Sequence, residues 1–314
     1  VAAVMVVLFH MFEGSARALQ FHTDQIINHG YLSVDFFFML SGFVIGYAYD
    51  DRWGNMTLWN FCKRRLVRLQ PIVVMGMLLG GILFYFQGSE IFPNLEQTPV
   101  WKMLLVMTVG FTLLPVPVSL DVRGWSEMHP LNGPAWSLFF EYVANILYAV
   151  LIRKFTSRWL AVLVFLAGCA LIHQCYTQGN NIGGWTLDAE QCRVGLTRLM
   201  FPFFGGLLLF RLCKPGRLRH GFWWCSLLLA GALAVPHVGG AENFRLNGLY
   251  DAFCIIVIFH CQRNPDVLRK RNGFMVHNAK MVALHSACLL SVEEHGLWHY
   301  YLLRKSAVDR QILF

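Results

Sequence analysis

The stretch that decides the fold is residues 30–49, which read GYLSVDFFFMLSGFVIGYAY. A helix that crosses a membrane needs about 20 mostly apolar residues. This stretch has that length, and Asp35 is its only acidic or basic side chain. It therefore predicts a membrane-spanning helix, and similar runs recur along the chain.

The composition of the whole chain agrees with this segment. Of 314 residues, 56% are hydrophobic and only 14% are charged, whereas soluble domains carry about 25% charged residues. This balance excludes a soluble enzyme, a disordered protein and a nucleic-acid binder. The net charge of +8 is then explained by basic cytoplasmic loops, because membrane proteins concentrate Lys and Arg there. The lipid bilayer is the expected partner, and nucleic acid is not.

Apolar runs mark nine candidate spans. They are 1–12, 30–49, 71–87, 101–118, 136–152, 159–176, 196–210, 221–238 and 248–260.

The basic loops set the expected topology. Lys and Arg gather in 50–70, 153–158, 211–220 and 261–272, and all four should be cytoplasmic. They share one side only if the chain crosses an odd number of times between 71 and 135. The weakest candidate there is 101–118, which contains Lys102, Pro115 and Pro117. We therefore predict an all-α, multi-pass transmembrane helical bundle with about eight crossings and one re-entrant or interfacial segment.

The chain divides into a membrane domain, 1–260, and an atypical tail, 261–314. Two explanations of the tail stay open: a cytoplasmic tail with an interfacial helix near 280–303, or out-of-frame translation. Val1 begins inside a hydrophobic run, so we expect a segment to precede it.

Ionisable groups inside spans are costly and are candidates for function. His10, Asp35 and Glu141 lie in predicted spans, and at 1.5 Å per residue each sits about 5–8 Å below the outer edge. An imidazole takes up and returns protons near neutral pH, and a carboxylate fixes its tautomer. The alternative for the two carboxylates is a structural one, as polar groups that bridge helices.

Other polar residues admit two interpretations. Ser41-Gly42 is typical of a close helix-packing point. The run Lys63–Arg68 is typical of a cytoplasmic anchor, but Arg65 and Arg68, three apart on one helical face, suit phosphates of a cofactor. No metal site is expected, because the histidines lack ligand spacing and the nine cysteines contain no C-x-x-C pair.

Four motifs, in order, resemble those of the acyltransferase-3 family of membrane proteins. Residues 37–43 resemble its FFxxSGF signature, Arg65-x-x-Arg68 and Trp136-Ser137-Leu138-x-x-Glu141 resemble its next two motifs, and His10 stands where the family carries the His of Arg-x10-His. The Arg of that last motif falls before Val1, and two usual further spans do not follow residue 260. The chain thus resembles an N-terminally truncated member with an atypical C-terminus.

The resemblance implies transfer of an acyl group, often acetyl, from cytoplasmic acyl-CoA to a sugar hydroxyl on the far side of a bacterial inner membrane. Acyl-CoA is then a co-substrate, no cofactor is permanently bound, and the acceptor is an O-antigen, capsule or exopolysaccharide unit. His10 is the implied catalytic base, with Asp35 and Glu141 on the catalytic side. Arg65, Arg68 and Ser41 are expected on the acyl-CoA side.

Two further functions stay open at this point. Intramembrane His and carboxylate groups also relay protons in transporters and flippases. An inactive, truncated acyltransferase also accounts for the two missing ends.

Overall fold

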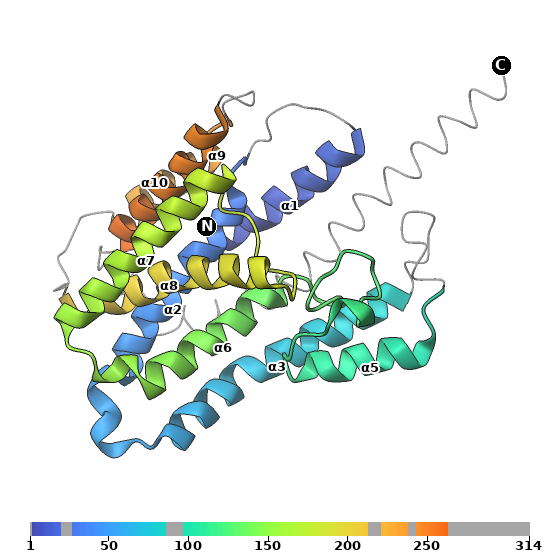
Figure 1. The fold of residues 1–314 in the computed structure, drawn as a ribbon, viewed down its shortest axis with the longest axis horizontal. Helices are drawn as coiled ribbons and strands as arrows, with labels where there is room; N and C mark the ends of the chain where they lie inside the picture. Colours follow the sequence, from blue (N-terminus) through green and yellow to red (C-terminus); the bar gives the residue numbers. More distant parts are fainter. Residues whose placement is uncertain (1, 20–26, 86–96, 213–220, 238–242, 263–314) are drawn as a thin grey trace.

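The computed structural model describes residues 2–19, 27–85, 97–212, 221–237 and 243–262. The secondary structure of these residues is entirely helical (Figure 1), which confirms the all-α class. The α-helices are α1 (Ala2–Leu19), α2 (Ser33–Tyr49), α3 (Leu58–Tyr85), α5 (Val100–Phe111), α6 (Ala135–Val150), α7 (Ser157–Gln178), α8 (Ala189–Leu212), α9 (Gly221–Ala234) and α10 (Phe244–Gln262). Short 3-10 helices flank α2, namely η1 (Gly30–Leu32) and η2 (Asp50–Asn55).

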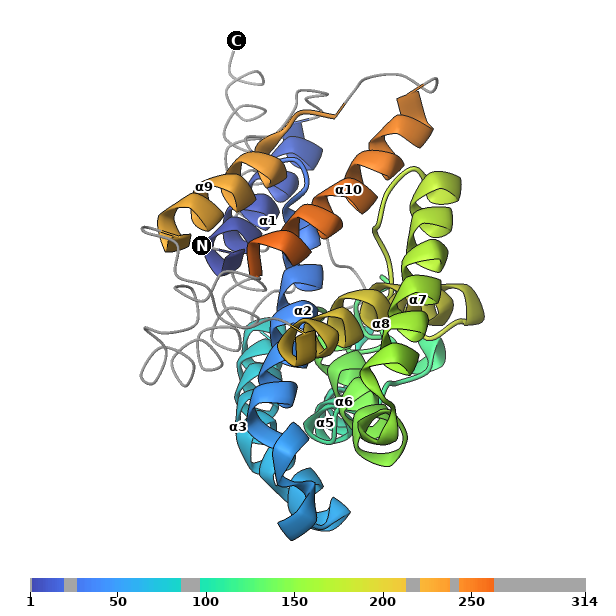
Figure 2. The same cartoon turned by 90° about the vertical axis from the view of Figure 1, so that its left-hand side faces the viewer.

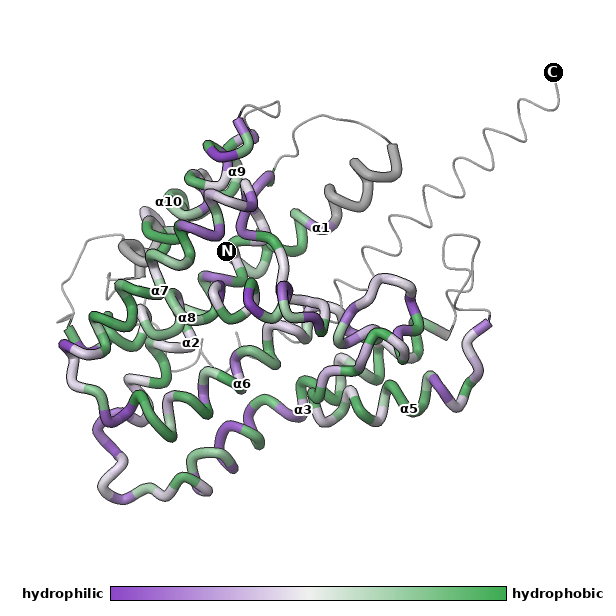
Figure 3. The backbone as a smooth tube through the Cα atoms, viewed as in Figure 1, coloured by the Kyte–Doolittle hydropathy of each residue, from purple (hydrophilic) through white to green (hydrophobic). Residues whose placement is uncertain are grey.

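Four helical segments in this part of the chain have the length and hydropathy to cross a membrane. They are Gly30–Asn55, Leu58–Phe84, Ser157–Gln178 and Ala189–Leu212. Large apolar side chains such as Trp159 and Phe165 lie exposed on α7, and Figure 3 shows hydrophobic residues along most helices. The chain is a membrane protein. Each predicted span overlaps a helix, but the count of about eight crossings is not confirmed.

The centre of the molecule is the crossing of α2 and α8 (Figure 2). A Cβ on Gly42 would overlap the backbone carbonyl of Phe203, and a Cβ on Gly206 would overlap that of Met39. Glycine at both positions therefore lets the two backbones touch. This contact confirms that Ser41-Gly42 marks a close packing point.

Helix α3 begins earlier than the sequence analysis predicts. Residues 50–70 were expected to form a loop with a helix starting at Pro71, but α3 runs from Leu58 and contains Pro71 in its interior. Membrane helices tolerate an internal proline where neighbours satisfy the freed backbone groups. A buried stripe at every fourth residue explains the extension: Phe61, Arg65, Leu69, Val73 and Met77.

Helix α5 forms an antiparallel hairpin with α3. Gly110 packs near Met77 and Gly81 packs near Met107. The 12 residues of α5 span about 18 Å, which is shorter than the hydrocarbon core of about 30 Å. The segment 101–118 is thus not a full-length spanning helix. The irregular segment that follows is buried in part: Met128 and Leu131 are fully covered, whereas Leu114 and Trp125 are exposed.

The core consists of three apolar clusters that share helices. One joins α2, α6, α7 and α8. A second joins α1, α2, α7, α9 and α10, and the third joins α3, α5 and α6. Figure 2 shows α1, α9 and α10 gathered at one end and α3, α5 and α6 at the other, with α2 extending from one group to the other and α8 crossing it.

Candidate functional site

Three polar residues from separate sequence motifs meet at one carboxylate oxygen. Ser41 Oγ donates a hydrogen bond to Glu141 Oε1 at 2.5 Å, and Arg65 Nη2 donates to the same oxygen at 2.6 Å. The residues come from α2, α6 and α3. We call Ser41, Arg65 and Glu141 the Glu141 cluster.

The Glu141 cluster is largely screened from solvent. The Arg65 side chain is 4% exposed and that of Glu141 is 16% exposed. A buried charge is tolerated only when it is paired and hydrogen-bonded, and each ion here supplies the charge that the other needs. Arg68, one turn further along α3, is exposed. Of the two arginines predicted to face phosphates, Arg65 is thus buried and Arg68 is exposed.

Asp35 belongs to a second ion pair. Arg198 Nη2 lies 2.8 Å from Asp35 Oδ2, and both side chains are fully buried. Asn181 Nδ2 donates to the other oxygen of Asp35 at 3.2 Å, so both carboxylate oxygens are occupied. The Arg198 guanidinium also lies over the Trp136 ring at 5.1 Å, a favourable cation–π arrangement.

Helix α6 touches both ion pairs. Trp136 contacts Arg198, the partner of Asp35, while Glu141 contacts Ser41. Helices α2 and α6 therefore both pass from the Asp35 pair to the Glu141 cluster in the same chain direction. The topology predicted for residues 30–49 and 136–152 requires this shared direction. Ser41 follows Asp35 by six residues, or about 9 Å along a helix. Asp35 and Glu141 therefore belong to separate polar groups, and their common depth in a membrane stays a prediction.

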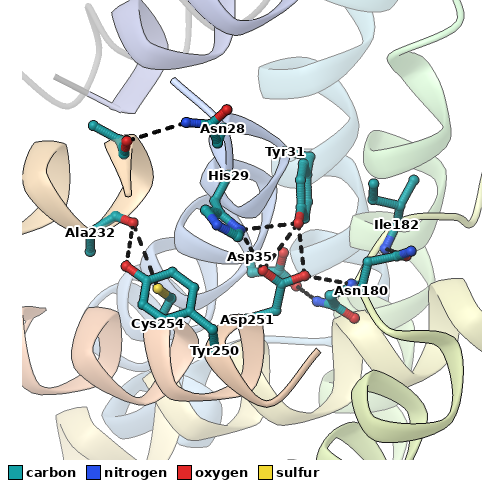
Figure 4. Close-up of polar contacts among 12 residues, drawn as sticks. Asn28, His29, Tyr31, Asp35, Asn180, Ile182, Ala232, Tyr250, Asp251 and Cys254 are labelled. Atoms are coloured by element: carbon teal, nitrogen blue, oxygen red, sulfur yellow. Dashed lines mark hydrogen bonds and ion pairs between the residues drawn. The ribbon is translucent and has the colours of Figure 1, made fainter. Parts of the chain in front are cut away.

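A third group of polar residues surrounds Asp251 on α10 (Figure 4). His29 Nδ1 lies 2.7 Å from Asp251 Oδ1, and the Tyr31 hydroxyl donates to both oxygens of that carboxylate at 2.8 and 3.0 Å. The backbone N–H of Asn181 donates to Asp251 Oδ2 at 2.8 Å. We call His29, Tyr31 and Asp251 the Asp251 cluster. Asn181 links it to Asp35.

His10 lies on the part of α1 that packs against η1. Its ring meets that of Phe9 edge to face at 5.2 Å between centroids. Phe9 in turn meets Tyr31 edge to face at 5.7 Å. These contacts place the His10 turn of α1 beside the Asp251 cluster.

The structure brings together three of the six predicted site residues, Ser41, Arg65 and Glu141. Sequence reasoning missed His29, Asn181, Arg198 and Asp251. A signal existed for two of them: Arg198 and Asp251 are ionisable residues inside the predicted spans 196–210 and 248–260. The rule that singled out Asp35 applies equally to both.

Comparison with known proteins gives a family match and similar relatives. The family model described as "Acyltransferase domain" matches residues 1–276. The chain is 36% identical over 139 residues to "Protein 2 in picA locus" of Rhizobium radiobacter, which covers 41% of this chain and 71% of that protein. It is 28% identical over 154 residues to "Acyltransferase MdmB" of Streptomyces mycarofaciens, covering 44% of this chain and 35% of that relative. No solved structure matches significantly.

Proposed function

The chain belongs to the acyltransferase-3 family, and on this premise we propose that it transfers an acyl group, in the first instance acetyl, from cytoplasmic acyl-CoA to a carbohydrate hydroxyl. The proposed acceptor is a cell-surface or lipid-linked glycan, such as an O-antigen, capsule or exopolysaccharide unit. The proposed location is the bacterial inner membrane, which the chain crosses several times.

The observation that carries this proposal is the convergence on Glu141. Three motifs far apart in sequence contribute one polar residue each to the cluster, and Ser41 and Arg65 donate to a single oxygen. Ionisable groups inside membrane proteins are costly and are therefore candidates for function by default. Since Arg65 and Glu141 fix each other, α3 is held at a defined position against α6.

The residues around the cluster suit an acyl-CoA donor. CoA carries phosphates, and arginine recognises phosphate by charge and by its fork of N–H groups. Arg68 is exposed on the surface of α3. Lys63 and Arg64 are also exposed on α3. Arg68 is therefore the proposed phosphate contact, and Arg65 the residue that holds its helix in place.

His10 is the proposed acid–base residue. A neutral imidazole takes the proton of the attacking hydroxyl, and the imidazolium returns it to the thiolate that leaves. The oxygen–acyl bond forms as the sulfur–acyl bond breaks, so the products are an ester and free CoA.

The experiment compares wild-type protein with His10→Ala in cells that make the acceptor glycan. Mass spectrometry of the glycan measures ester-linked acetyl, and immunoblotting of membranes measures protein. We expect acetylation in the wild type and its loss in the variant at equal protein level. Unchanged acetylation in the variant would reject His10 as the base. Absence of acetyl-CoA-dependent acetylation in the wild type would reject the enzyme and favour a transporter or an inactive chain.

A further inference from the structure

The Asp251 cluster contains a histidine whose orientation is fixed by a carboxylate. His29 and Asp251 have side chains that are 1% exposed, and they meet through Nδ1 at 2.7 Å. A carboxylate only accepts hydrogen bonds, so the hydrogen of this bond belongs to Nδ1. In the neutral ring, Nε2 then carries the lone pair.

Nε2 of His29 is buried and has no hydrogen-bond partner among the residues that the structure describes. More than nine in ten buried polar groups are paired, so an exception needs an explanation. The carboxylate of Asp251 is fully paired, because the Tyr31 hydroxyl and the backbone N–H of Asn181 also donate hydrogen bonds to it. The orphaned atom is thus the one that acts as a base in a His–carboxylate pair.

His129 is a second buried histidine, and its hydrogen-bond partner differs from that of His29. The Nε2–H of His129 donates to the carbonyl oxygen of Leu113, and its Nδ1 also has no partner in the described part of the chain. A backbone carbonyl orients that ring without supplying a charge. His29 differs because the partner of its Nδ1–H is the carboxylate of Asp251, which is the arrangement of a His–carboxylate pair.

The His29 ring lies one side-chain layer below a partly exposed residue. The half-buried His237 ring packs against it at 4.2 Å between centroids, and the Tyr250 ring lies at 4.8 Å. The backbone N–H of His29 donates to the Leu233 carbonyl at the end of α9. His29 also precedes η1 and α2, at the end of α2 where the topology from the basic loops places the outer side and hence the acceptor.

We propose that His29, oriented by Asp251, is a second acid–base residue of the acyl transfer and takes the proton of the acceptor hydroxyl. This proposal rests on the proposed function and revises its proton path: His29, in place of His10, takes the proton of the hydroxyl, and His10 begins the step as an imidazolium. His10 then serves the leaving thiolate. The contact of Phe9 with Tyr31 places the two histidines on packed segments.

The hydroxyl O–H bond breaks and its proton passes to His29 Nε2, while the oxygen forms a bond to the thioester carbonyl carbon. The C–S bond breaks with its electron pair on sulfur, and the sulfur takes a proton from the His10 imidazolium. His29 afterwards releases a proton to water and His10 takes one up, so one ester and one thiol form and both rings return to their starting states.

The test uses the full chain in membranes that contain its natural glycan, with radiolabelled acetyl-CoA as the probe and alkali-labile label in carbohydrate as the readout. His29→Asn keeps a side-chain N–H near the position of Nδ1, and so keeps the bond to Asp251, but it deletes Nε2. Asp251→Asn keeps the shape of the carboxylate and removes its charge. His173→Asn changes an exposed histidine on α7 and is the matched control.

We expect His29→Asn to lower kcat by about 100-fold or more, with the KM for acetyl-CoA unchanged, because general-base catalysis contributes about 10²–10⁴-fold. We expect Asp251→Asn to lower kcat by up to about 10⁴-fold, as the amide favours the wrong tautomer, and the control to match the wild type. Rates are normalised to the folded fraction found by gel filtration. A normalised loss below about threefold in His29→Asn overturns the proposal, whereas an inactive wild type overturns the proposed function itself.

Discussion

The Arg65 guanidinium lies 2.6 Å from the Glu141 carboxylate, although the two residues are 76 positions apart in the chain. This contact joins the first third of α3 to the middle of α6. It also accounts for the inward direction of one arginine in a strongly basic segment whose other cations are exposed.

Breaking this ion pair from one side should cost more than removing both charges. Arg65→Gln leaves Glu141 buried without a cation, and we expect a loss of about 3–5 kcal/mol in the free energy of unfolding. The double variant Arg65→Gln/Glu141→Gln leaves no uncompensated charge and should recover part of that loss. Denaturant unfolding in detergent measures both. The exposed neighbour Arg64→Gln is the control, and strictly additive losses would contradict the pairing.

Substitution of Asp35 should lower the stability of the protein more than its acetyl-transfer rate. Its two oxygens are held by Arg198 and Asn181, so Asp35→Asn leaves the buried Arg198 cation unpaired. We expect unfolding free energy to fall by about 3–5 kcal/mol, while the acetyl-transfer rate per folded molecule changes by less than about tenfold. A large loss of rate in a fully stable variant would instead place Asp35 in the chemistry.

One added methyl group at the α2–α8 crossing should destabilise the protein. Gly42→Ala introduces a Cβ that overlaps the Phe203 carbonyl, and we expect a destabilisation of about 1–3 kcal/mol or more, since backbone must move. Gly231→Ala on α9 is the matched control, because nothing lies within 4 Å of its Cβ. Helix propensity predicts that the control gains about 0.5–1 kcal/mol. Equal unfolding midpoints for the two variants would refute this packing.

The stability of the protein should fall on mild acidification because of His129. Burial lowers the pKa of His129 from 6.5 to about 4, although its bond to the Leu113 carbonyl raises it slightly. In the unfolded chain His129 therefore binds a proton below pH 6.5, whereas in the folded chain it binds one only below about pH 4. Stability is fully present above this window and declines through it, by up to about 3 kcal/mol.

Unfolding midpoints at a series of pH values measure this effect. His129→Asn removes the titrating group and should flatten the slope between the two pKa values, whereas His173→Asn, at an exposed position, should leave it unchanged. An identical slope in the His129 variant would show that other groups account for the acid sensitivity.

The apolar runs predicted where the helices lie, because spans must be long, apolar and internally hydrogen-bonded. The start of α3 was missed, since charged residues at 63–68 resembled a loop. The four-residue spacing of Phe61, Arg65, Leu69 and Val73 indicates a helix. The spacing is visible in the sequence only if Arg65 is treated as a buried residue.

Sequence patterns could not predict which residues pair with the buried ions. Glu141 and Ser41 were both candidates, but 100 residues separate them. His29 and Asp251 are 222 positions apart. Periodicity describes which face of a helix is buried, whereas the identity of the facing helix depends on how all the helices pack.

The most direct test of the central claim is acetyl transfer from radiolabelled acetyl-CoA to membrane-associated glycan by wild-type protein and by Glu141→Gln. The variant keeps an oxygen for Ser41 but removes the charge that faces Arg65. We predict label in alkali-labile carbohydrate esters with the wild type and a loss of about 100-fold or more with the variant, as for other buried electrostatic groups of a site. Equal labelling by wild type and variant, at equal folded protein, would contradict the assignment of the Glu141 cluster to the acyl-transfer site.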